Sequence, residues 1–317
     1  MTLPTSTTIQ QLTRPYLLKG YRPGGYLGPL IRKMPLIPYP QAGQQIRFNR
    51  GDTAPTPAVY AAGDNETAAP LETTLVTLTF QRLGAQLELD IADALAASDV
   101  NDQLQVQIQA LKVQMIRLLL EQLCTGDGSA PNLNGFAAGT DTSQTTGAAN
   151  GAANGGVPTI EDVALLVTNV TASDDYVGAG PDCLAGTSKA GRFLYKLMRD
   201  AGETPMFRMD PDLGVPIMHF MGLPFYIGPF ATNETKGTGT NLTSIYAFKK
   251  NGPSGVHIAY SPLNGNVDAW GMMAYMIPDQ LGIGKRGAGG MGYYQIVYPE
   301  LASIARLNGC DLSGMIG

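Results

Sequence analysis

The sequence predicts an α+β fold in which helices and strands are grouped rather than strictly alternating. Three observations carry this prediction. Strand-like alternation of apolar residues occurs on both sides of a long polar segment within 46–90. A helical apolar pattern of about 25 residues follows, roughly twice the mean helix length. Short strand patterns mixed with two further helices then complete the chain, and no repeat of solenoid or propeller period is present.

Charged residues are scarce in this chain. It has 317 residues, 21 basic and 26 acidic, so that 15% are charged, whereas an average soluble domain carries roughly 25%. The hydrophobic fraction of 44% is enough for a sizeable core and excludes a disordered protein. A lone protein of this size needs a charged surface to stay in solution. We therefore expect other subunits to cover much of its surface.

Net charge and cysteine usage exclude further classes. A net charge of −5 and a pI near 5.1 disfavour a dedicated nucleic-acid binder. The three distant cysteines, Cys124, Cys183 and Cys310, argue against a disulfide framework and fit a reducing compartment. No apolar run approaches the ~20 residues of a membrane span, and residues 1–10 lack a secretory signal pattern. We expect a protein made in the cytosol that has no membrane partner.

Residues 1–45 are predicted to form an extended arm. Prolines recur there too often for a helix or a central strand, because each fixes φ and removes a hydrogen-bond donor. The residues between them, such as Tyr16, Leu17 and Tyr26, are too apolar for a free tail. We expect the arm to lie along a surface, either its own or a neighbour's.

Residues 46–90 are predicted to form one long β-hairpin. A short strand begins at Ile46, and strand alternation returns over 74–80 and again, after a break near Gly84, over 87–91. Between the strands, 52–70 is polar, without a period, and has little to bury. Such a segment is unusual inside a compact domain but reasonable for an arm that reaches a partner.

The next segment predicts a long helix ending at about Thr125, with Gly126 as its stop and Ser98, Asp99 or Asn101 as its cap. Its length corresponds to roughly 37 Å. One apolar face is expected from the spacing of Leu104, Ile108, Leu111, Met115 and Leu118. Lys112 and Arg117 are expected to pair with Glu121.

The remaining chain predicts a flexible, low-complexity loop over 137–156 and then mixed structure. A helix capped by Thr159 should bury Val163, Leu166, Val167 and Val170, and a further helix is expected over 188–200. The predicted strands of this part are 182–185, 215–220, 225–227, 244–248, 255–260, 270–277, 293–298 and 301–307.

No constellation of residues predicts an enzyme. The two histidines, His219 and His257, lie within apolar strand patterns, where a histidine with one satisfied nitrogen is the ordinary interpretation. The cysteines are too isolated for a zinc site. The glycine-rich run 282–292 lacks the strand-then-helix context of a phosphate-binding loop and is predicted to be a hinge or loop. We therefore expect no catalytic, cofactor or metal site.

The order of these elements resembles the major capsid protein of tailed bacteriophages, which has the Hong Kong 97 fold. The most specific stretch is the end of the long helix, Leu123-Cys124-Thr125-Gly126-Asp127-Gly128-Ser129, followed by Gly135-Phe136 with one residue more than the family's usual spacing. The segment 196–202, which ends in Asp-Ala-Gly, and the turn 221–225, which contains Gly-Leu-Pro, are similar to further markers of that family.

The resemblance implies a domain organisation along the chain. It implies an N-terminal arm (1–45), an extended loop over the adjacent subunit (46–90), a peripheral domain with the long spine helix (91–126 and 266–304) and an axial domain (127–265 and 305–317). Between Met34 and Leu111 there is no lysine, so the cross-link that some members make from this loop cannot form. The chain begins at the arm without a charged scaffolding segment, from which we expect either a separate scaffolding protein or prior removal of such a segment; the retained Met1 favours the separate protein.

These implications predict a structural protein that assembles into an icosahedral phage head around double-stranded DNA, built as hexamers and pentamers in the host bacterial cytoplasm. A portal, a possible decoration protein and DNA bound without sequence specificity are its expected partners. An encapsulin-like nanocompartment shell is the alternative, and an α+β hydrolase or binding protein is a remote one. Charged residues of the hairpin base and tip are expected at subunit contacts: Arg47, Arg50, Asp52, Asp64 and Glu66.

Overall fold

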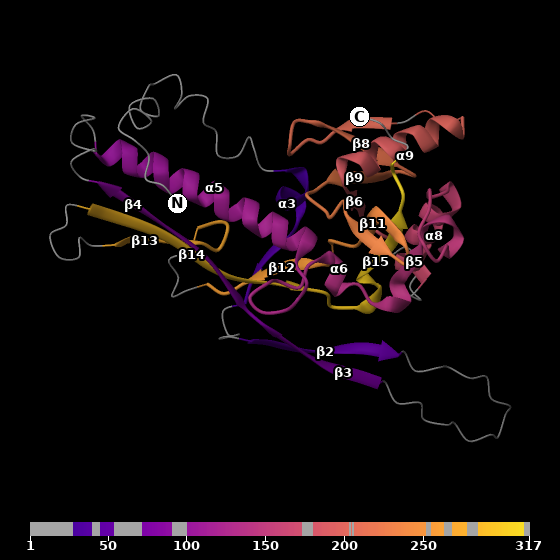
Figure 1. Cartoon of the computed structure of the whole chain (residues 1–317). Helices are drawn as coiled ribbons and strands as arrows, with labels where there is room; N and C mark the ends of the chain where they lie inside the picture. Colours follow the sequence, from indigo (N-terminus) through magenta and orange to yellow (C-terminus); the bar gives the residue numbers. More distant parts are fainter. Residues whose placement is uncertain are drawn as a thin grey trace, which may run out of the picture.

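The computed structural model describes residues 28–39, 45–53, 72–90, 100–172, 180–202, 204, 206–251, 255–262, 268–277 and 285–313. These residues form two lobes and a hairpin that projects from them (Figure 1). The α5 lobe consists of the long helix α5 and a five-stranded sheet, and the α8–α9 lobe consists of an eight-stranded sheet with the helices α8 and α9. The mixture of helices and strands confirms the predicted α+β class.

The α-helices of the described residues differ greatly in length. They are α3 (Pro29–Lys33), α5 (Val100–Thr125), α6 (Phe136–Gly139), α7 (Ala148–Gly151), α8 (Ile160–Ala172) and α9 (Ser188–Asp200). Two short 3-10 helices accompany them, η2 (Thr142–Gln144) and η3 (Leu301–Ser303).

The strands form three sheets. The α5 lobe contains β1 (Leu36–Pro38), β4 (Gln81–Asp90), β12 (His257–Tyr260), β13 (Met273–Ile277) and β14 (Lys285–Val297). The α8–α9 lobe contains β5 (Thr145–Gly147), β6 (Cys183–Gly186), β7 (Met206–Met209), β8 (Pro216–Phe220), β9 (Leu223–Ile227), β10 (Glu234–Lys236), β11 (Gly239–Phe248) and β15 (Ile304–Cys310). The projecting hairpin is β2 (Gln45–Thr53) paired with β3 (Glu72–Thr79).

The hairpin is shorter than the sequence predicted. β2 and β3 pair from Gln45↔Thr79 toward the tip of the hairpin. β4, in contrast, pairs along its whole length with β14, from Gln81↔Tyr294 to Asp90↔Lys285. The prediction of one hairpin over 46–90 is therefore wrong for 81–90. The sequence shows strand alternation before Phe80 and a break only near Gly84, which lies inside β4, so the pattern could not show that the chain changes partner at Phe80.

Helix α5 confirms the predicted long helix and its end at Thr125, whereas its predicted caps Ser98 and Asp99 lie outside the described residues. Its buried side chains include Leu111, Met115, Leu119 and Leu123, but Leu118 is 38% exposed, so the predicted face is shifted toward Leu119. Lys112 is also not bound as expected, since its Nζ lies 2.9 Å from Asp268 Oδ2.

The glycine-rich run is a strand rather than the predicted loop. Residues 285–292 belong to β14, while 282–284 lie outside the described residues. A Cβ on Gly290 would lie 2.8 Å from Met115 Sδ, and one on Gly292 would lie 2.5 Å from Tyr294 Cε2. Glycine suits this strand because the Met115 side chain of α5 and neighbouring aromatic rings lie directly on its backbone.

The eight-stranded sheet is covered on both faces. Leu184, Ile245 and Ala247 face a core built with α8 and α9, whereas Tyr246 and Phe248 face the core that includes Leu123 and Phe136. Successive residues of a strand point to opposite faces, which explains why the strands are buried without interruption.

The segment 137–156 is not the predicted flexible loop. It forms α6, η2, β5 and α7, and β5 pairs in parallel with β15. The buried carboxylate of Asp162 accepts hydrogen bonds from the backbone N–H groups of Ala149 (3.0 Å), Asn150 (3.1 Å) and Thr159 (2.8 Å). Thr159 Oγ1 in turn accepts from Asp162 N, which confirms Thr159 as the cap of α8.

Part of the N-terminal arm also has regular structure. Residues 29–33 form a helix despite the predicted absence of helices, because Pro29 occupies the first turn, where no N–H is required. Leu30 and Ile31 are completely buried. β1 is an edge strand next to β12, as expected for a segment that contains Pro38, and residues 1–27 lie outside the described residues.

β1 is joined to the sheet through a buried histidine. His257 Nδ1 lies 2.9 Å from Gly255 O, so this nitrogen carries the proton, and Nε2 accepts from the Tyr39 hydroxyl at 2.8 Å. The two rings stack at 5.9 Å. Burial lowers the pKa of His257 below its ordinary 6.5, because the imidazolium would lose its hydration.

Acidification is therefore expected to weaken the fold through His257. The folded pKa lies below the unfolded value, so the neutral ring stabilises the protein above about pH 6.5, and this contribution is lost as the pH falls through the folded pKa. The free energy of unfolding measured in urea at pH 7.5 and 5.5 should fall less for His257→Gln than for the unmodified protein. Equal losses in the two proteins would contradict the assignment.

Candidate functional site

The base of the projecting hairpin is held by a small apolar cluster. Ile46, Phe80 and Val297 are buried together with Ala259, and Phe48 and Leu78 pack against them. In the described part of the hairpin, this cluster anchors the base. Side chains farther along β3 are largely exposed, and Leu75 is 62% exposed. The described part of the hairpin therefore offers apolar surface that its own chain does not cover.

A buried glutamine connects the hairpin base to the loop after α5. Gln295 of β14 donates from Nε2 to Thr79 O at 2.8 Å, and its Oε1 accepts from Asn134 N at 3.0 Å. Tyr298, also buried, donates its hydroxyl to Asn134 O at 3.1 Å. The hairpin angle is thus set by groups from three distant parts of the chain.

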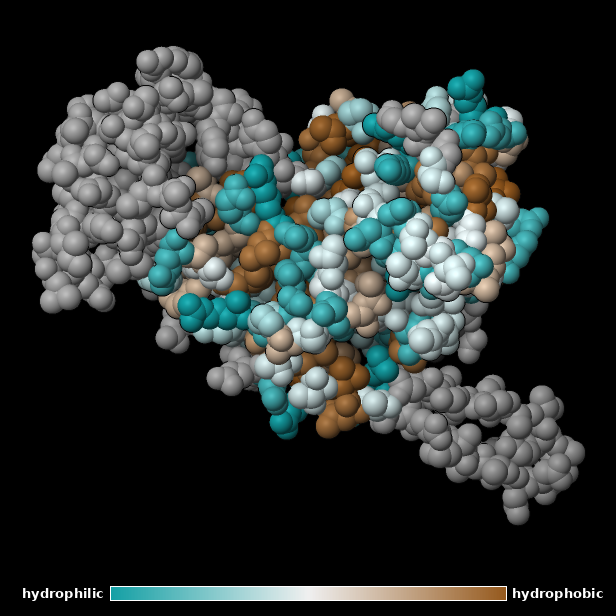
Figure 2. All heavy atoms as spheres, viewed as in Figure 1, coloured by the Kyte–Doolittle hydropathy of each residue, from teal (hydrophilic) through white to brown (hydrophobic). Residues whose placement is uncertain are grey.

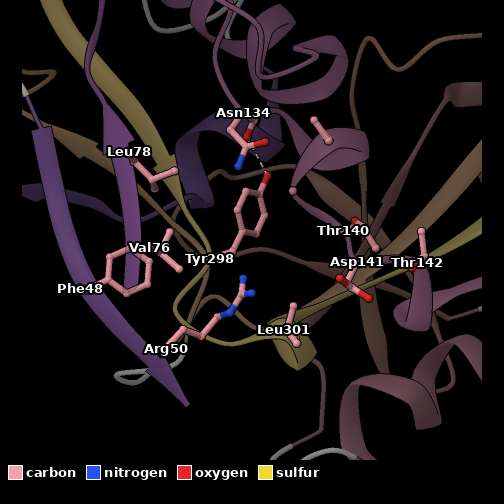
Figure 3. A pocket seen from close by; sticks show the side chains of 12 residues that line it. Phe48, Arg50, Val76, Leu78, Asn134, Thr140, Asp141, Thr142, Tyr298 and Leu301 are labelled. Atoms are coloured by element: carbon pink, nitrogen blue, oxygen red, sulfur yellow. Dashed lines mark hydrogen bonds between the residues drawn. The ribbon is translucent and has the colours of Figure 1, made fainter. Parts of the chain in front are cut away.

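A cavity of about 280 Å³ lies between the hairpin base and the body. Figure 3 shows Phe48, Arg50, Val76 and Leu78 on the hairpin side, with Asn134, Tyr298 and the segment 140–142 across from them. The Arg50 side chain extends from β2 toward the centre of the cavity. Its walls combine apolar side chains with a cation and a carboxylate.

The carboxylate is Asp141, whose pKa lies below its ordinary value. Its Oδ1 accepts from Ser143 N at 2.8 Å, and this hydrogen bond is the largest cause, to which the positive charge of Arg50 adds. Arg50 and Asp141 are therefore an attractive pair across the hairpin base. Asp141 was not singled out in the sequence, where it shows only the signature of a turn.

The pair predicts a measurable coupling between hairpin and body. In a double-mutant cycle with Arg50→Gln and Asp141→Asn, we expect about 0.2–1 kcal/mol of interaction in the free energy of unfolding, since both groups are partly exposed. Arg47→Gln is the matched control, because Arg47 is exposed and donates to Gln45 Oε1 of its own strand at 3.0 Å. An interaction energy between Arg50 and Asp141 no larger than that between Arg47 and Asp141 would show that this pair does not hold the hairpin at its angle.

The predicted contact residues differ in their surroundings, and some of them lie outside the described residues. Arg47 and Arg50 lie on β2, the first exposed and the second in the cavity. Asp52 belongs to β2, but nothing of its side chain is described, and Asp64 and Glu66 lie outside the described residues. Their role between subunits stays a prediction.

The groups considered for chemistry have structural surroundings. His219 Nδ1 contacts Ile217 O at 3.1 Å, and the three cysteines are buried and unpaired. The Gly126-Asp127-Gly128 segment that resembles capsid proteins is structural as well, since Asp127 accepts from Ser129 and Asn132 in the turn after α5. Within the described ranges, no three His, Cys, Asp or Glu side chains gather as a metal site would require. None of the helices described here has the length and apolarity of a membrane span.

Comparisons with known proteins identify the fold. No family model and no curated protein matches the sequence. Among solved structures, the holo-SrpI encapsulin complex from Synechococcus elongatus PCC 7942 matches with a TM-score of 0.64 and 15% identity, over 99% of this chain and 98% of that one. The Cyanophage A-1(L) capsid gives a TM-score of 0.64 and 15% identity over 95% and 99%.

The capsid of the native GTA particle is also similar, with a TM-score of 0.58 and 13% identity over 98% of this chain and 92% of that one. These matches cover nearly the whole length of both partners. They confirm that the chain has the Hong Kong 97-type fold that phage capsid proteins and encapsulins share.

Proposed function

We propose that this protein is the structural subunit of a closed icosahedral shell and acts without catalysis. The observation that carries the proposal is the β2–β3 hairpin, which projects from a body of shell-protein fold and leaves side chains such as Leu75 exposed. Exposed apolar side chains on a two-stranded ribbon need a partner, because such a ribbon is marginally stable alone. Other copies of the chain are the partner that this fold supplies.

The division of the chain follows from the same proposal. Residues 1–45 are the arm, 91–126 and 266–304 the peripheral domain, and 127–265 and 305–317 the axial domain. The extended loop was expected over 46–90, and we place its end at Phe80, because β4 pairs in the sheet of the α5 lobe.

Contacts of the hairpin with the next subunit involve Arg47, Asp52, Asp64 and Glu66, while Arg50 adjusts the hairpin angle through Asp141. Arg47→Glu should reduce assembly and leave the circular dichroism of the unassembled protein unchanged. Assembly at an unaltered level would remove Arg47 from the interface.

The content we propose is double-stranded phage DNA. A net charge of −5 suits a wall that does not grip phosphates while DNA moves in and out. A separate scaffolding protein, a portal and a decoration protein are the proposed partners, and the virion is the proposed location.

An encapsulin-like nanocompartment is the second candidate. The observation in its favour is that the SrpI encapsulin and the cyanophage capsid give the same TM-score of 0.64. A shell of this kind would enclose a protein rather than DNA.

One experiment tests the shell and its content together. The expressed protein, and a variant in which 54–71 is replaced by Gly-Ser-Gly-Ser, are examined by electron microscopy. Closed particles are expected for the first and unassembled, folded subunits for the second. Nuclease-protected DNA in particles from producing cells supports the phage head, and a co-purified protein supports the compartment. A protein that stays monomeric at high concentration refutes the shell.

A further inference from the structure

A groove runs along α9 on the outer surface of the α8–α9 lobe. It has a volume of about 690 Å³ and is lined by α9, by β7, β8 and β9 and by Pro29. Its apolar wall includes Tyr195, Phe207 and Ile227, all at least one-third exposed, and the rings of Tyr195 and Phe207 lie 6.1 Å apart. Figure 2 shows hydrophobic surface in this region of the lobe. Soluble proteins rarely leave such apolar surface uncovered.

The apolar wall is bordered by positive charge. Lys189, Arg192, Lys196 and Arg199 follow one another along the exposed side of α9, and Arg192 and Lys196 line the groove itself. Among the charged residues of α9, only Asp200 is acidic. This concentration of cations stands out in a protein whose net charge is −5. The occupant of the groove should therefore be apolar and acidic.

The position of the groove wall is fixed by ion pairs. Lys33 of α3 lies 2.8 Å from Asp210 Oδ1 and 2.5 Å from Asp212 Oδ2, which joins α3 to the turn between β7 and β8. Asp210 also accepts from the backbone of Asp212 and Leu213, so the turn itself is held. The groove is thus formed before any partner arrives, and a partner need not spend binding energy on ordering it.

One segment of the sequence has the required chemistry. From Gly51 to Gln81 the chain contains Asp52, Asp64, Glu66 and Glu72 but no lysine or arginine. The same stretch contains Val59 and Tyr60. Residues 1–27, in contrast, carry Arg14, Lys19 and Arg22 and no acidic residue. Their charge has the same sign as that of the groove, which would repel them.

We propose that the α9 groove of one copy receives the hairpin segment 54–71 of a second copy. Asp64 and Glu66 pair with Arg192 and Lys196, and Val59 and Tyr60 enter the apolar part. Figure 1 shows the hairpin and the groove-forming elements α9 and β8 on opposite sides of the molecule. A donor and an acceptor on opposite sides make a heterologous contact, which closes into a ring when the rotation between copies allows it. This inference rests on the proposed function and names the surface through which it operates.

Disulfide trapping tests the contact directly. Ala62→Cys and Ser188→Cys are introduced together, and assembled particles are oxidised; the cysteines already present are buried. Covalent oligomers larger than a dimer are expected on a non-reducing gel, because each copy donates to the next. Each single variant is the control and should give no such ladder. Particles that form normally but give no ladder, or only an internally linked monomer, overturn the groove contact and leave the shell function intact.

A charge exchange tests the same contact without cysteines. Arg192→Glu with Lys196→Glu should lower the particle yield about tenfold, because like charges then face each other. Adding Asp64→Lys and Glu66→Lys should restore the yield to within about twofold of the original. Circular dichroism of the unassembled variants checks that each folds. A yield that the exchange does not restore, in folded protein, contradicts the pairing. If the unmodified chain forms no particles at all, the shell function itself fails.

Discussion

Replacement of Phe136 by alanine is expected to lower the free energy of unfolding by about 3–5 kcal/mol. Phe136 is completely buried, and its ring centroid lies 4.9 Å from that of Phe248, 5.6 Å from that of Tyr246 and 5.8 Å from that of Phe230. Truncation removes these contacts and leaves a cavity that β-sheet residues on one side and α5 on the other cannot fill by moving.

Urea denaturation of the unassembled subunit, followed by circular dichroism, measures this loss. Phe136→Leu keeps most of the apolar volume and should lose less than about 1.5 kcal/mol. Phe207→Ala is the second control, because Phe207 is 57% exposed and should change the free energy of unfolding by about 0.5 kcal/mol at most. If Phe136→Ala and Phe207→Ala cost the same, Phe136 does not hold the central core.

Replacement of the neighbouring Gly135 by alanine should be nearly as damaging, for a different reason. A Cβ on Gly135 would lie 2.6 Å from Gly126 O and 2.7 Å from Gln122 O, both of them backbone atoms. Gly135 N donates to Gly126 O at 3.1 Å, so the two segments cannot separate without losing this bond. Overpacking against fixed backbone predicts a loss of about 3 kcal/mol.

Gly84→Ala provides the matched control for Gly135→Ala. A Cβ on Gly84 would meet its nearest atoms at 3.5 Å, which is ordinary van der Waals contact. Its effect on the free energy of unfolding should stay within about 0.5 kcal/mol. Equal losses in the two variants would show that the close approach at Gly135 does not constrain the fold.

Phe136 and Gly135 also show why the resemblance of this segment to capsid proteins was informative. The phrase from Leu123 to Phe136 ends a helix and turns the chain back against it, with Gly128 at φ +76° and Gly126 and Gly135 in backbone contact. Such a turn needs particular residues at particular positions, so it is visible in the sequence. The fold that the solved structures confirm was predictable through features of this local kind.

Errors in the sequence interpretation have a common physical origin. Composition alone assigned 285–292 and 137–156 to loops, whereas the structure pairs β14 with β4 and β5 with β15. Glycine suits those places because distant side chains such as Met115 lie on the backbone, and nothing in the neighbouring sequence records that contact. The exposure of Leu118 on α5 also results from distant contacts, because the elements that pack against a helix determine which of its sides is buried.

The candidate site also combines residues that the sequence singled out with residues that only the fold brings next to them. Arg47 and Arg50 were singled out as cations at the hairpin base, opposite the acidic residues of its tip. Asp141, whose pKa Arg50 helps to lower, is 91 positions away from Arg50 in the chain. The groove on α9 was not foreseen, because its lining comes from Pro29, α9, β7, β8 and β9.

Local sequence patterns predicted the α+β class, the length and end of α5, the cap of α8, the bounds of α9, and a hairpin with a long polar segment. Those features depend on periodicity and turn chemistry among residues close together in the chain. Tertiary contacts, in contrast, establish where the hairpin ends, which carboxylate faces Arg50 and which cations border an apolar groove. Each of these depends on groups from distant parts of the chain, and their proximity is created by the packing of helices and strands that are far apart in the sequence.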